Sequence, residues 1–296
     1  MKIKLRILFT LFSILLLTGC TITLNEADSS DTSETKPVTS ANDQVFVHII
    51  DIGQGDSIFI QTPKENIVID GGNKGKGETV IDYLKEHGVK QLDAVISTHP
   101  DADHIGGLAD IINAFPVQSV YAPRITHTTV AYRNFLQSVK AQGLKIKVAK
   151  KDVQIPVSEQ SLDLHFIGPT KNYSKNDLND WSAVLLMQHG DKKFLFTGDA
   201  ETQAEEDMLE AGIVPKVDVL KVSHHGAREA SNSDFLAVAK PTYAAISVGK
   251  DNRYGHPTAE ALHRLKTIHA KIYRTDQHGT IVFTSNGTKI SVKVER

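Results

Sequence analysis

Four side chains of types that bind metal ions lie within six consecutive positions: His99, Asp101, Asp103 and His104. An apolar run typical of a β-strand ends just before them, and a run with helical spacing begins just after Gly106-Gly107. If the segment is extended, His99 and Asp101 point to one side, whereas Asp103 and His104 diverge at the turn. The spacing therefore indicates a site for two metal ions at the end of a strand.

Taken one at a time, these residues indicate only a polar turn that caps the next helix, with two histidines on the surface. All four together, followed by Gly-Gly and placed between a strand-like and a helix-like run, favour a metal site.

Three later segments place carboxylate or imidazole groups at the ends of predicted strands. Asp199 follows an apolar run in a Gly-Asp turn, and His224 and His225 follow the run over residues 217–222. His256 lies in a loop between a predicted strand and a predicted helix. If the strand continued, His224 and His225 would point to opposite faces, so we expect only one of them to bind metal. Alone, each segment indicates a turn or loop, but beside the cluster each is a candidate ligand.

The cluster resembles the metal-binding motif of the metallo-β-lactamase superfamily, in which a second histidine normally stands at the position of Asp101. Two upstream turns, residues 51–56 and 69–72, and then the cluster resemble in that order the metallo-hydrolase domain of ComEC-type competence proteins. A carboxylate in place of imidazole makes the ligand set harder, which favours manganese or mixed occupancy over zinc alone. The resemblance therefore implies two divalent metal ions, zinc or manganese.

The resemblance also implies a role for each candidate. One ion would be held by His99, Asp101 and Asp199, and the other by Asp103, His104, Asp199 and one of His224, His225 and His256. Asp70 would orient the ligands, although an Asp-Gly turn explains this residue equally well. Asn179 stands where many members of the superfamily have a third metal-binding histidine, and it would contribute an oxygen ligand or cap a loop.

The expected chemistry is metal-assisted hydrolysis. Water activated by the ions near neutral pH would attack phosphorus or a carbonyl carbon. Asp103 would accept the proton, and His225 would reach the metals or the leaving group. Lys221 would stabilise phosphate charge, or it is an exposed lysine on a strand. The carboxylate-rich ligand set and the ComEC resemblance favour a phosphodiester in DNA or a nucleotide as the substrate.

Two other functional classes stay open. One is a hydrolase of an ester, a lactone or a β-lactam. The absence of the third metal-binding histidine at position 179 and the ComEC-like turns count against this class. The other is a non-catalytic lipoprotein that binds DNA or a partner on the same scaffold, against which the retention of nearly every ligand position counts.

The first twenty residues resemble a bacterial lipoprotein signal peptide. Lys2, Lys4 and Arg6 precede a short apolar run that ends in Leu17-Thr18-Gly19-Cys20. This lipobox implies lipid attachment at Cys20, with an ordinary signal peptide or an uncleaved anchor as the alternative. Residues 21–44 are rich in Ser, Thr, Asp and Glu and are expected to form a disordered tether. We therefore expect a membrane-anchored protein on the outer side of the cell membrane.

Composition narrows the remaining possibilities. Cys20 is the single cysteine of the sequence. A disulfide within this sequence, and a catalytic thiol or a thiolate zinc ligand within residues 45–296, are therefore excluded. Removal of the three cations of the signal segment would shift the formal charge from −2 by three units, to −5. The overall charge therefore gives no sign of the basic surface that is typical of nucleic acid binding. Metal ions would nevertheless supply local positive charge for a polyanionic substrate.

Residues 45–296 alternate between strand-like and helix-like segments in two strand-rich halves. This order predicts the α/β class, and the resemblance implies the αββα four-layer sandwich with the metal site on one rim. We expect the three closing strands, residues 271–274, 279–284 and 289–294, to belong to the second sheet.

Overall fold

The computed structural model describes residues 44–296. The predicted signal segment with Cys20, and the predicted tether up to residue 43, lie outside the described residues. Within residues 44–296, no helix combines the length and the apolar character needed to cross a membrane.

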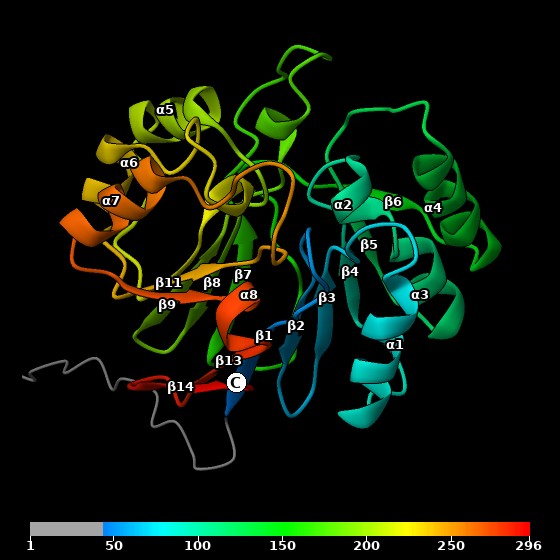
Figure 1. Ribbon diagram of the computed structural model, residues 1–296. Coiled ribbons are helices and arrows are strands. Elements are labelled where there is room, and N and C mark those ends of the chain that lie inside the picture. The colour runs from blue at the N-terminus through cyan, green and yellow to red at the C-terminus, as the bar shows by residue number, and fades with distance from the viewer. Residues whose placement is uncertain (1–43) are drawn as a thin grey trace, which may run out of the picture. The chain divides into compact units, whose positions relative to one another are not determined.

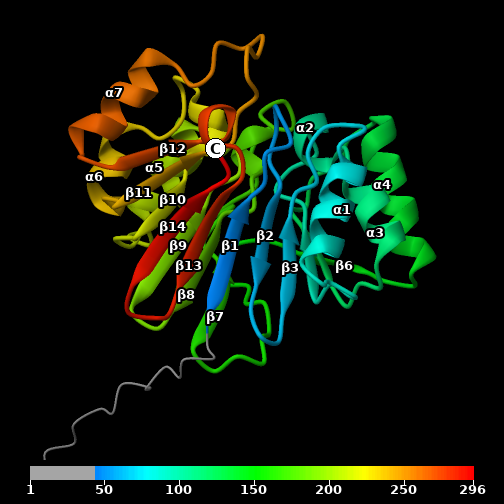
Figure 2. The same cartoon turned by 60° about the horizontal axis from the view of Figure 1, so that its bottom comes forward.

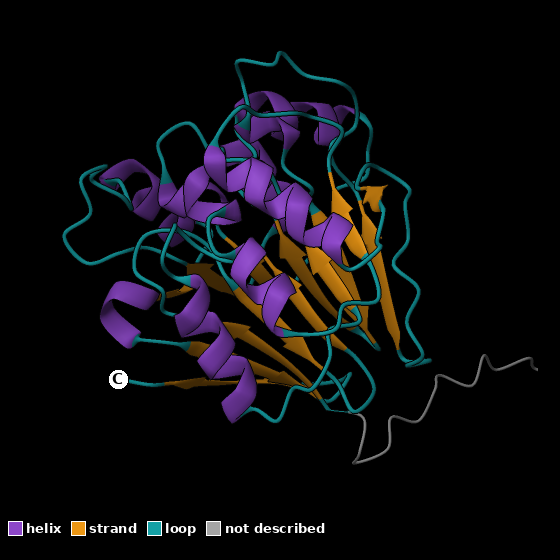
Figure 3. Cartoon of the chain, turned by 90° about the vertical axis from the view of Figure 1, so that its right-hand side faces the viewer, coloured by secondary structure: helices purple, strands orange, loops and turns teal. Residues whose placement is uncertain are grey.

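Two β-sheets lie against each other in the middle of the described chain, and helices cover their outer faces (Figures 1 and 3). The first sheet has the strand order β14-β13-β1-β2-β3-β4-β5-β6. Its strands are β1 (Val45–Ile49), β2 (Ile58–Gln61), β3 (Asn66–Ile69), β4 (Ala94–Ile96), β5 (Val120–Ala122), β6 (Ile146–Val148), β13 (Ile281–Ser285) and β14 (Ile290–Val294). Strands β3 to β6 are parallel, and the other neighbours are antiparallel.

The second sheet has the order β12-β11-β10-β9-β8-β7. Its strands are β7 (Leu162–Phe166), β8 (Leu185–His189), β9 (Lys192–Phe196), β10 (Val219–Lys221), β11 (Tyr243–Ile246) and β12 (Lys271–Arg274). Strands β9 to β12 are parallel, whereas β7 and β8 are antiparallel to their neighbours.

The expected membership of the closing strands is wrong for two of the three. Only β12 joins the second sheet, whereas β13 pairs antiparallel with β1 and β14 extends that edge (Figure 2). A short helix, α8 (Thr275–His278), redirects the chain between β12 and β13. Thus the last two strands return to the sheet in which the folded part of the chain begins.

Three apolar layers hold the four structural layers together. The inner faces of the sheets share one core, which includes Val47, Ile60, Phe166 and Phe196. The first sheet buries its outer face against α1 (Gly77–Glu86), α3 (Leu108–Ala114) and α4 (Val130–Ala141). The second sheet buries its outer face against α5 (Thr202–Glu210), α6 (Ser233–Ala239) and α7 (Ala259–Thr267). The predicted αββα sandwich is therefore confirmed.

The parallel strands of both sheets bring polar residues to one rim. Asp70 directly follows β3, and His99 lies three residues beyond β4. In the other sheet, Asp199 follows β9 and His224 follows β10. The rims meet, because Ala183 N–H, just before β8, donates to Thr98 O at 2.9 Å. Ligands of α/β proteins characteristically bind at the carboxyl ends of strands.

Gly106 and Gly107 allow this rim to pack closely. Gly107 would place a Cβ 2.2 Å from Gly71 O, and Gly106 would place one 2.3 Å from Lys74 N. Both contacts are with backbone atoms, which cannot turn aside as a side chain does. The Gly-Gly pair therefore lets α2 (Ala102–Ile105), which carries Asp103 and His104, lie directly against the turn after β3.

Candidate metal centre

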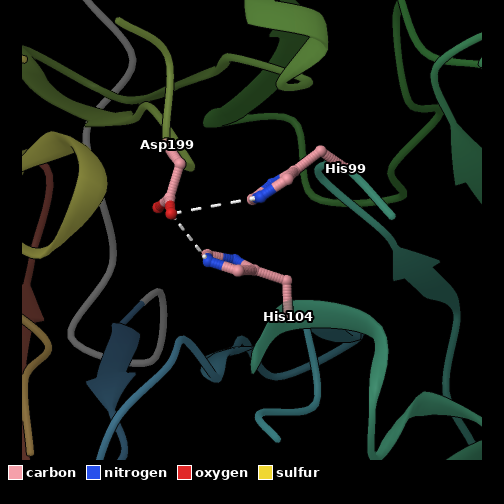
Figure 4. Close-up of side chains that lie close together, drawn as sticks. All are labelled: His99, His104 and Asp199. Carbon is pink, nitrogen blue, oxygen red and sulfur yellow. Dashed lines mark ion pairs between the residues drawn. The ribbon is translucent and has the colours of Figure 1, made fainter. Parts of the chain in front are cut away.

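A buried carboxylate, that of Asp199, lies at the centre of the rim. Figure 4 shows it facing His99, from the loop after β4, and His104, from α2. Asp199 Oδ2 lies 3.1 Å from His104 Nε2 and 4.0 Å from His99 Nε2. All three side chains are almost wholly removed from solvent. Three groups able to bind one metal ion, far apart in the sequence, therefore converge within a few ångströms.

The turn after β10 adds two more imidazoles. His225 Nε2 lies 3.5 Å from Asp199 Oδ2 and 3.4 Å from Asp103 Oδ2. His224 Nε2 lies 3.8 Å from the same Asp199 oxygen. Asp103, His104 and His225 form a second group whose ligand atoms are close enough to share an ion.

The expectation for His224 and His225 assumed that the strand continues through both residues, and this assumption is wrong. The strand ends at Lys221, and both histidines have positive φ, 47° and 54°. This left-handed backbone replaces the alternation of a strand with a tight turn, so both rings reach Asp199. Which of them binds metal remains a prediction.

Each of the four imidazoles has its outer nitrogen fixed by a partner. His104 Nδ1 bonds to Asp70 Oδ2 at 2.8 Å, and His225 Nδ1 donates to Ser247 O at 2.8 Å. His224 Nδ1 lies 2.9 Å from Glu201 Oε1, and His99 Nδ1 lies 3.1 Å from Thr98 Oγ1. Because these contacts occupy Nδ1, the four Nε2 atoms are the ones presented to Asp199.

Asp70 lies where a residue that orients the ligands is needed. Its two carboxylate oxygens accept hydrogen bonds from Thr98 N–H at 2.8 Å and from Thr98 Oγ1–H at 2.6 Å. Since that hydroxyl proton is used, Thr98 Oγ1 accepts from His99 Nδ1–H. Asp70 itself has a φ of 58°, a conformation that Asp and Asn tolerate better than most residues. One buried carboxylate thus orients His104 directly and His99 through Thr98.

The remaining predicted ligands line the open side of the site. A pocket of about 120 Å³ is lined by Gln54, Asp101, Asp103, Asp199, His224, His225, Tyr254 and His256. Asp101 Oδ2 lies 3.6 Å from His99 Nε2, and 38% of its side chain is exposed. The His256 ring lies 5.4 Å from that of His224 and 5.8 Å from that of Tyr254, centroid to centroid. The pocket therefore opens the centre to solvent on the side of Asp101 and His256.

Asn179 contacts the site through another residue. Its Nδ2 donates to Glu201 Oε1 at 2.8 Å and lies 3.5 Å from His224 Nδ1. Sequence reasoning missed Glu201, although it comes only two residues after Asp199. Together, Asn179 and Glu201 hold the ring of His224.

Lys221 does not have the position expected of a residue that contacts substrate, nor is it exposed. Its side chain is fully buried, and Nζ lies 2.7 Å from Asp56 Oδ2 and donates to Val222 O at 2.9 Å. Asp56 in turn places Oδ1 3.4 Å from His225 Nδ1. We therefore correct the catalytic role predicted for Lys221 to that of a buried counter-charge. Asp56 was missed as a charged partner because it lies 165 positions earlier in the chain.

Electrostatics within the cluster favour ionised carboxylates. Burial opposes the ionisation of Asp199, but the positive charges of His104 and His225 hold its pKa well below the usual range. Burial likewise opposes charge on His225, yet Asp199, Asp103 and Asp56 raise its pKa to about 9. The imidazoles and carboxylates therefore bind protons between them when no metal is bound, and metal binding must release those protons.

The residues present fit a metal ion. His99 Nε2, His104 Nε2, His225 Nε2 and Asp199 Oδ1 are buried, and none has a hydrogen-bond partner within residues 44–296. Buried polar atoms in native proteins normally have partners, so three imidazole nitrogens and one carboxylate oxygen without partners at one place are suited to binding a cation. Imidazole nitrogens suit zinc, and the carboxylates of Asp101, Asp103 and Asp199 also suit manganese.

We predict that Asp70→Asn lowers the affinity for Zn²⁺ or Mn²⁺ by about 10- to 100-fold, because residues that orient metal ligands contribute on this scale. Asn keeps the positive φ of 58° but presents only one acceptor oxygen to Thr98 and His104. Competition with a chromogenic chelator measures the affinity. Asp152→Asn is the matched control, since Asp152 also has a positive φ, 68°, and is exposed away from the site. Equal affinity in both variants would show that Asp70 is only a turn residue.

We also predict that Lys221→Met lowers the free energy of unfolding by about 3–5 kcal/mol, because it leaves the buried Asp56 carboxylate without its partner. Urea denaturation measures this loss, and adding Asp56→Asn should recover part of it. Lys192→Met is the control: its partner Asp218 lies 3.1 Å away, but both side chains are partly exposed, so we expect about 1 kcal/mol or less. A stable Lys221→Met protein that has lost turnover would instead restore the catalytic role.

Comparison with known proteins agrees with this site. Residues 50–250 match the family model of the metallo-beta-lactamase superfamily. ComE operon protein 3 of Bacillus subtilis is 33% identical over 255 residues, which cover 80% of this chain and 32% of that protein. Competence protein ComA of Neisseria gonorrhoeae is 28% identical, with 84% and 33% covered. Recombination protein 2 of Haemophilus influenzae is also 28% identical, with 79% and 28% covered. The chain thus spans about a third of the length of these relatives.

Solved structures show the same fold. The metallo-beta-lactamase fold protein YhfI of Bacillus subtilis superposes with a TM-score of 0.52 at 13% identity, covering 82% of this chain and 100% of that one. Igni18, a metallo hydrolase of Ignicoccus hospitalis, gives 0.51 at 16% identity, covering 80% and 98%. The expected resemblance is confirmed, and the family supports a metal-dependent hydrolase. By its family match, its fold and its relatives, the chain belongs to the metallo-beta-lactamase superfamily.

Proposed function

We propose that this protein is a metal-dependent phosphodiesterase whose substrate is DNA or a nucleotide. The observation that carries the proposal is the buried Asp199 carboxylate, ringed by four imidazoles whose Nε2 atoms lie 3.1–4.0 Å from its Oδ2. When bound, divalent ions at such a centre supply Lewis-acid activation of water and neutralise charge on a phosphate. The proposed cofactors are two ions, zinc or manganese: one would be held by His99, Asp101 and Asp199, and the other by Asp103, His104, Asp199 and one of His224, His225 and His256.

Asp103 is the residue best placed to move the proton. It lines the pocket, 21% of its side chain is exposed, and Oδ2 lies 3.4 Å from His225 Nε2. Burial opposes its ionisation, but its contact with His225 and the charge of His104 keep the pKa below the ordinary value. It is therefore ionised at neutral pH and can accept a proton from the attacking water. His225 is 1% exposed and lies 3.4 Å from Asp103 and 3.5 Å from Asp199, and its role as a metal ligand or toward the leaving group remains a prediction.

Two features favour a phosphodiester over a carbonyl substrate. The pocket is lined by three carboxylates, Asp101, Asp103 and Asp199, which suit the hard ions used in phosphoryl transfer. The names of the relatives refer to competence and recombination, and recombination is a reaction of DNA.

The test is cleavage of bis-p-nitrophenyl phosphate and of single- and double-stranded DNA by the purified full-length protein with Mn²⁺ or Zn²⁺. We expect metal-dependent turnover that falls by about 100-fold or more in Asp103→Asn, because a general base contributes on that scale. Asp110→Asn, an exposed aspartate on α3, should keep full activity.

Metal content is measured in each variant, because Asp103 is also a candidate ligand. Protein that binds two metals but cleaves none of these substrates would contradict the proposal. Turnover of a lactone or of nitrocefin in its place would assign the site to carbonyl chemistry.

We further propose that the protein is anchored by lipid at Cys20 on the outer face of the cell membrane, on the evidence of the sequence alone. Cys20→Ser should then move the protein from the membrane fraction to the soluble fraction or the medium, as measured by immunoblotting. Unchanged membrane association in this variant would contradict the anchor.

A further inference from the structure

A second pocket, without acidic lining residues, lies on the same rim of the first sheet. It has a volume of about 350 Å³, and its lining includes Arg124, Lys150, Lys171 and Trp181. Three of these residues carry a positive charge and none carries a negative one. The pocket at the metal centre has the opposite character, because three aspartates line it.

The parallel strands fix where this pocket lies. Arg124 comes two residues after β5 and Lys150 two residues after β6, just as Asp70 and His99 follow β3 and β4. Strands β3 to β6 are hydrogen-bonded neighbours in that order. Neighbouring strands lie about 4.8 Å apart, so the end of β6 is about 10 Å from the end of β4.

A second connection leads from the pocket to the metal centre. Trp181 lines the pocket and belongs to the same short helix, η1 (Asn179–Trp181), as Asn179. Asn179 donates to Glu201, which holds His224. The wall of the basic pocket is therefore continuous with the groups that support the centre.

Two of the three cations are available to an external anion. Lys171 Nζ lies 2.7 Å from Asp207 Oδ2, which satisfies its charge. Arg124 and Lys150 are exposed and have no ion-pair partner within residues 44–296. The chain as a whole has a formal charge of −2, but these two unpaired cations make the surface at this pocket locally positive. A locally positive pocket favours the binding of an anion.

We infer that this pocket is a subsite for a second phosphate of a single nucleic acid strand whose scissile phosphate lies at the metal centre. The inference rests on the proposed function and extends it, because it makes the substrate a polynucleotide and not a mononucleotide. Because the strand ends lie about 10 Å apart, the phosphate in this pocket and the scissile phosphate would belong to different nucleotides of the same strand. Arg124 and Lys150 would contact phosphate oxygens, which fixes the register of the strand without reading its sequence.

Binding is tested with a fluorescein-labelled twelve-nucleotide oligodeoxythymidylate and full-length protein in detergent, with EDTA present so that no cleavage occurs. Arg124→Gln/Lys150→Gln should weaken binding on the order of tenfold and reduce the slope of log K against log[salt] by about 0.7, since each phosphate neutralised on a single strand contributes about that much. Lys145→Gln is the control: Lys145 is exposed near the other end of β6 and should change neither quantity. Circular dichroism and thermal melting establish that all variants are folded.

Activity gives an independent arm. In the double variant, KM for the oligonucleotide should rise about tenfold while kcat holds, and turnover of bis-p-nitrophenyl phosphate should not change, because that substrate has one phosphate. Unchanged oligonucleotide affinity, salt slope and KM would overturn the subsite even if the protein proves to be a nuclease. If the double variant loses binding to phosphatidylglycerol vesicles but binds the oligonucleotide as the unaltered protein does, the subsite is also overturned. The two cations would then be assigned to lipid headgroups. If no substrate is cleaved but oligonucleotide binding falls as expected, the subsite stands and only the proposed hydrolysis fails.

Discussion

The rest of the rim depends on one constraint, the burial of the Asp199 carboxylate among imidazoles. A charged group removed from water is tolerated only when opposite charge or hydrogen bonds compensate it. Here four imidazoles, from the loop after β4, from α2 and from the turn after β10, supply that compensation, as cations or as ligands of shared metal ions. Either way the two sheets are tied together at their carboxyl ends, because Asp199 comes from one sheet and His99 and His104 from the other.

The imidazoles can serve metals only because each outer nitrogen is held. Asp70, Thr98, Glu201 and the carbonyl of Ser247 each take one Nδ1, so that every Nε2 faces inward. Such partners fix the tautomer and the orientation of a ligand ring before the metal arrives. Backbone conformation contributes as well, since Asp70, His224 and His225 all have positive φ. At these three positions the cost of an uncommon backbone conformation coincides with side chains whose orientation the centre depends on.

The sequence predicted the parts of this site that local pattern determines. The cluster from His99 to His104 is contiguous, and strand-end positions for Asp70, Asp199 and the paired histidines follow from alternating runs, as does the α/β class. Contacts between distant positions were missed: Asp56 meets Lys221 only because the turn after β1 reaches β10. The direction of side chains was predicted wrongly where the backbone departs from regular strand geometry, as at His224 and His225. The pairing of β13 with β1, and of β14 with β13, likewise joins segments far apart in the sequence, which local patterns do not predict.

The buried Lys221–Asp56 pair explains how the centre can exchange protons for metal. With no metal bound, His225 holds a proton up to a pKa of about 9, and its positive charge is shared by Asp199, Asp103 and Asp56. If His225 binds a metal ion, its ring must first lose that proton, and without Lys221 this loss of charge would leave Asp56 as an uncompensated buried anion. Lys221 prevents this, because its ammonium lies 2.7 Å from Asp56 and is too far removed from solvent and substrate to do anything else. A fixed cation behind the site thus lets the histidine in front of it change its charge without disturbing the fold.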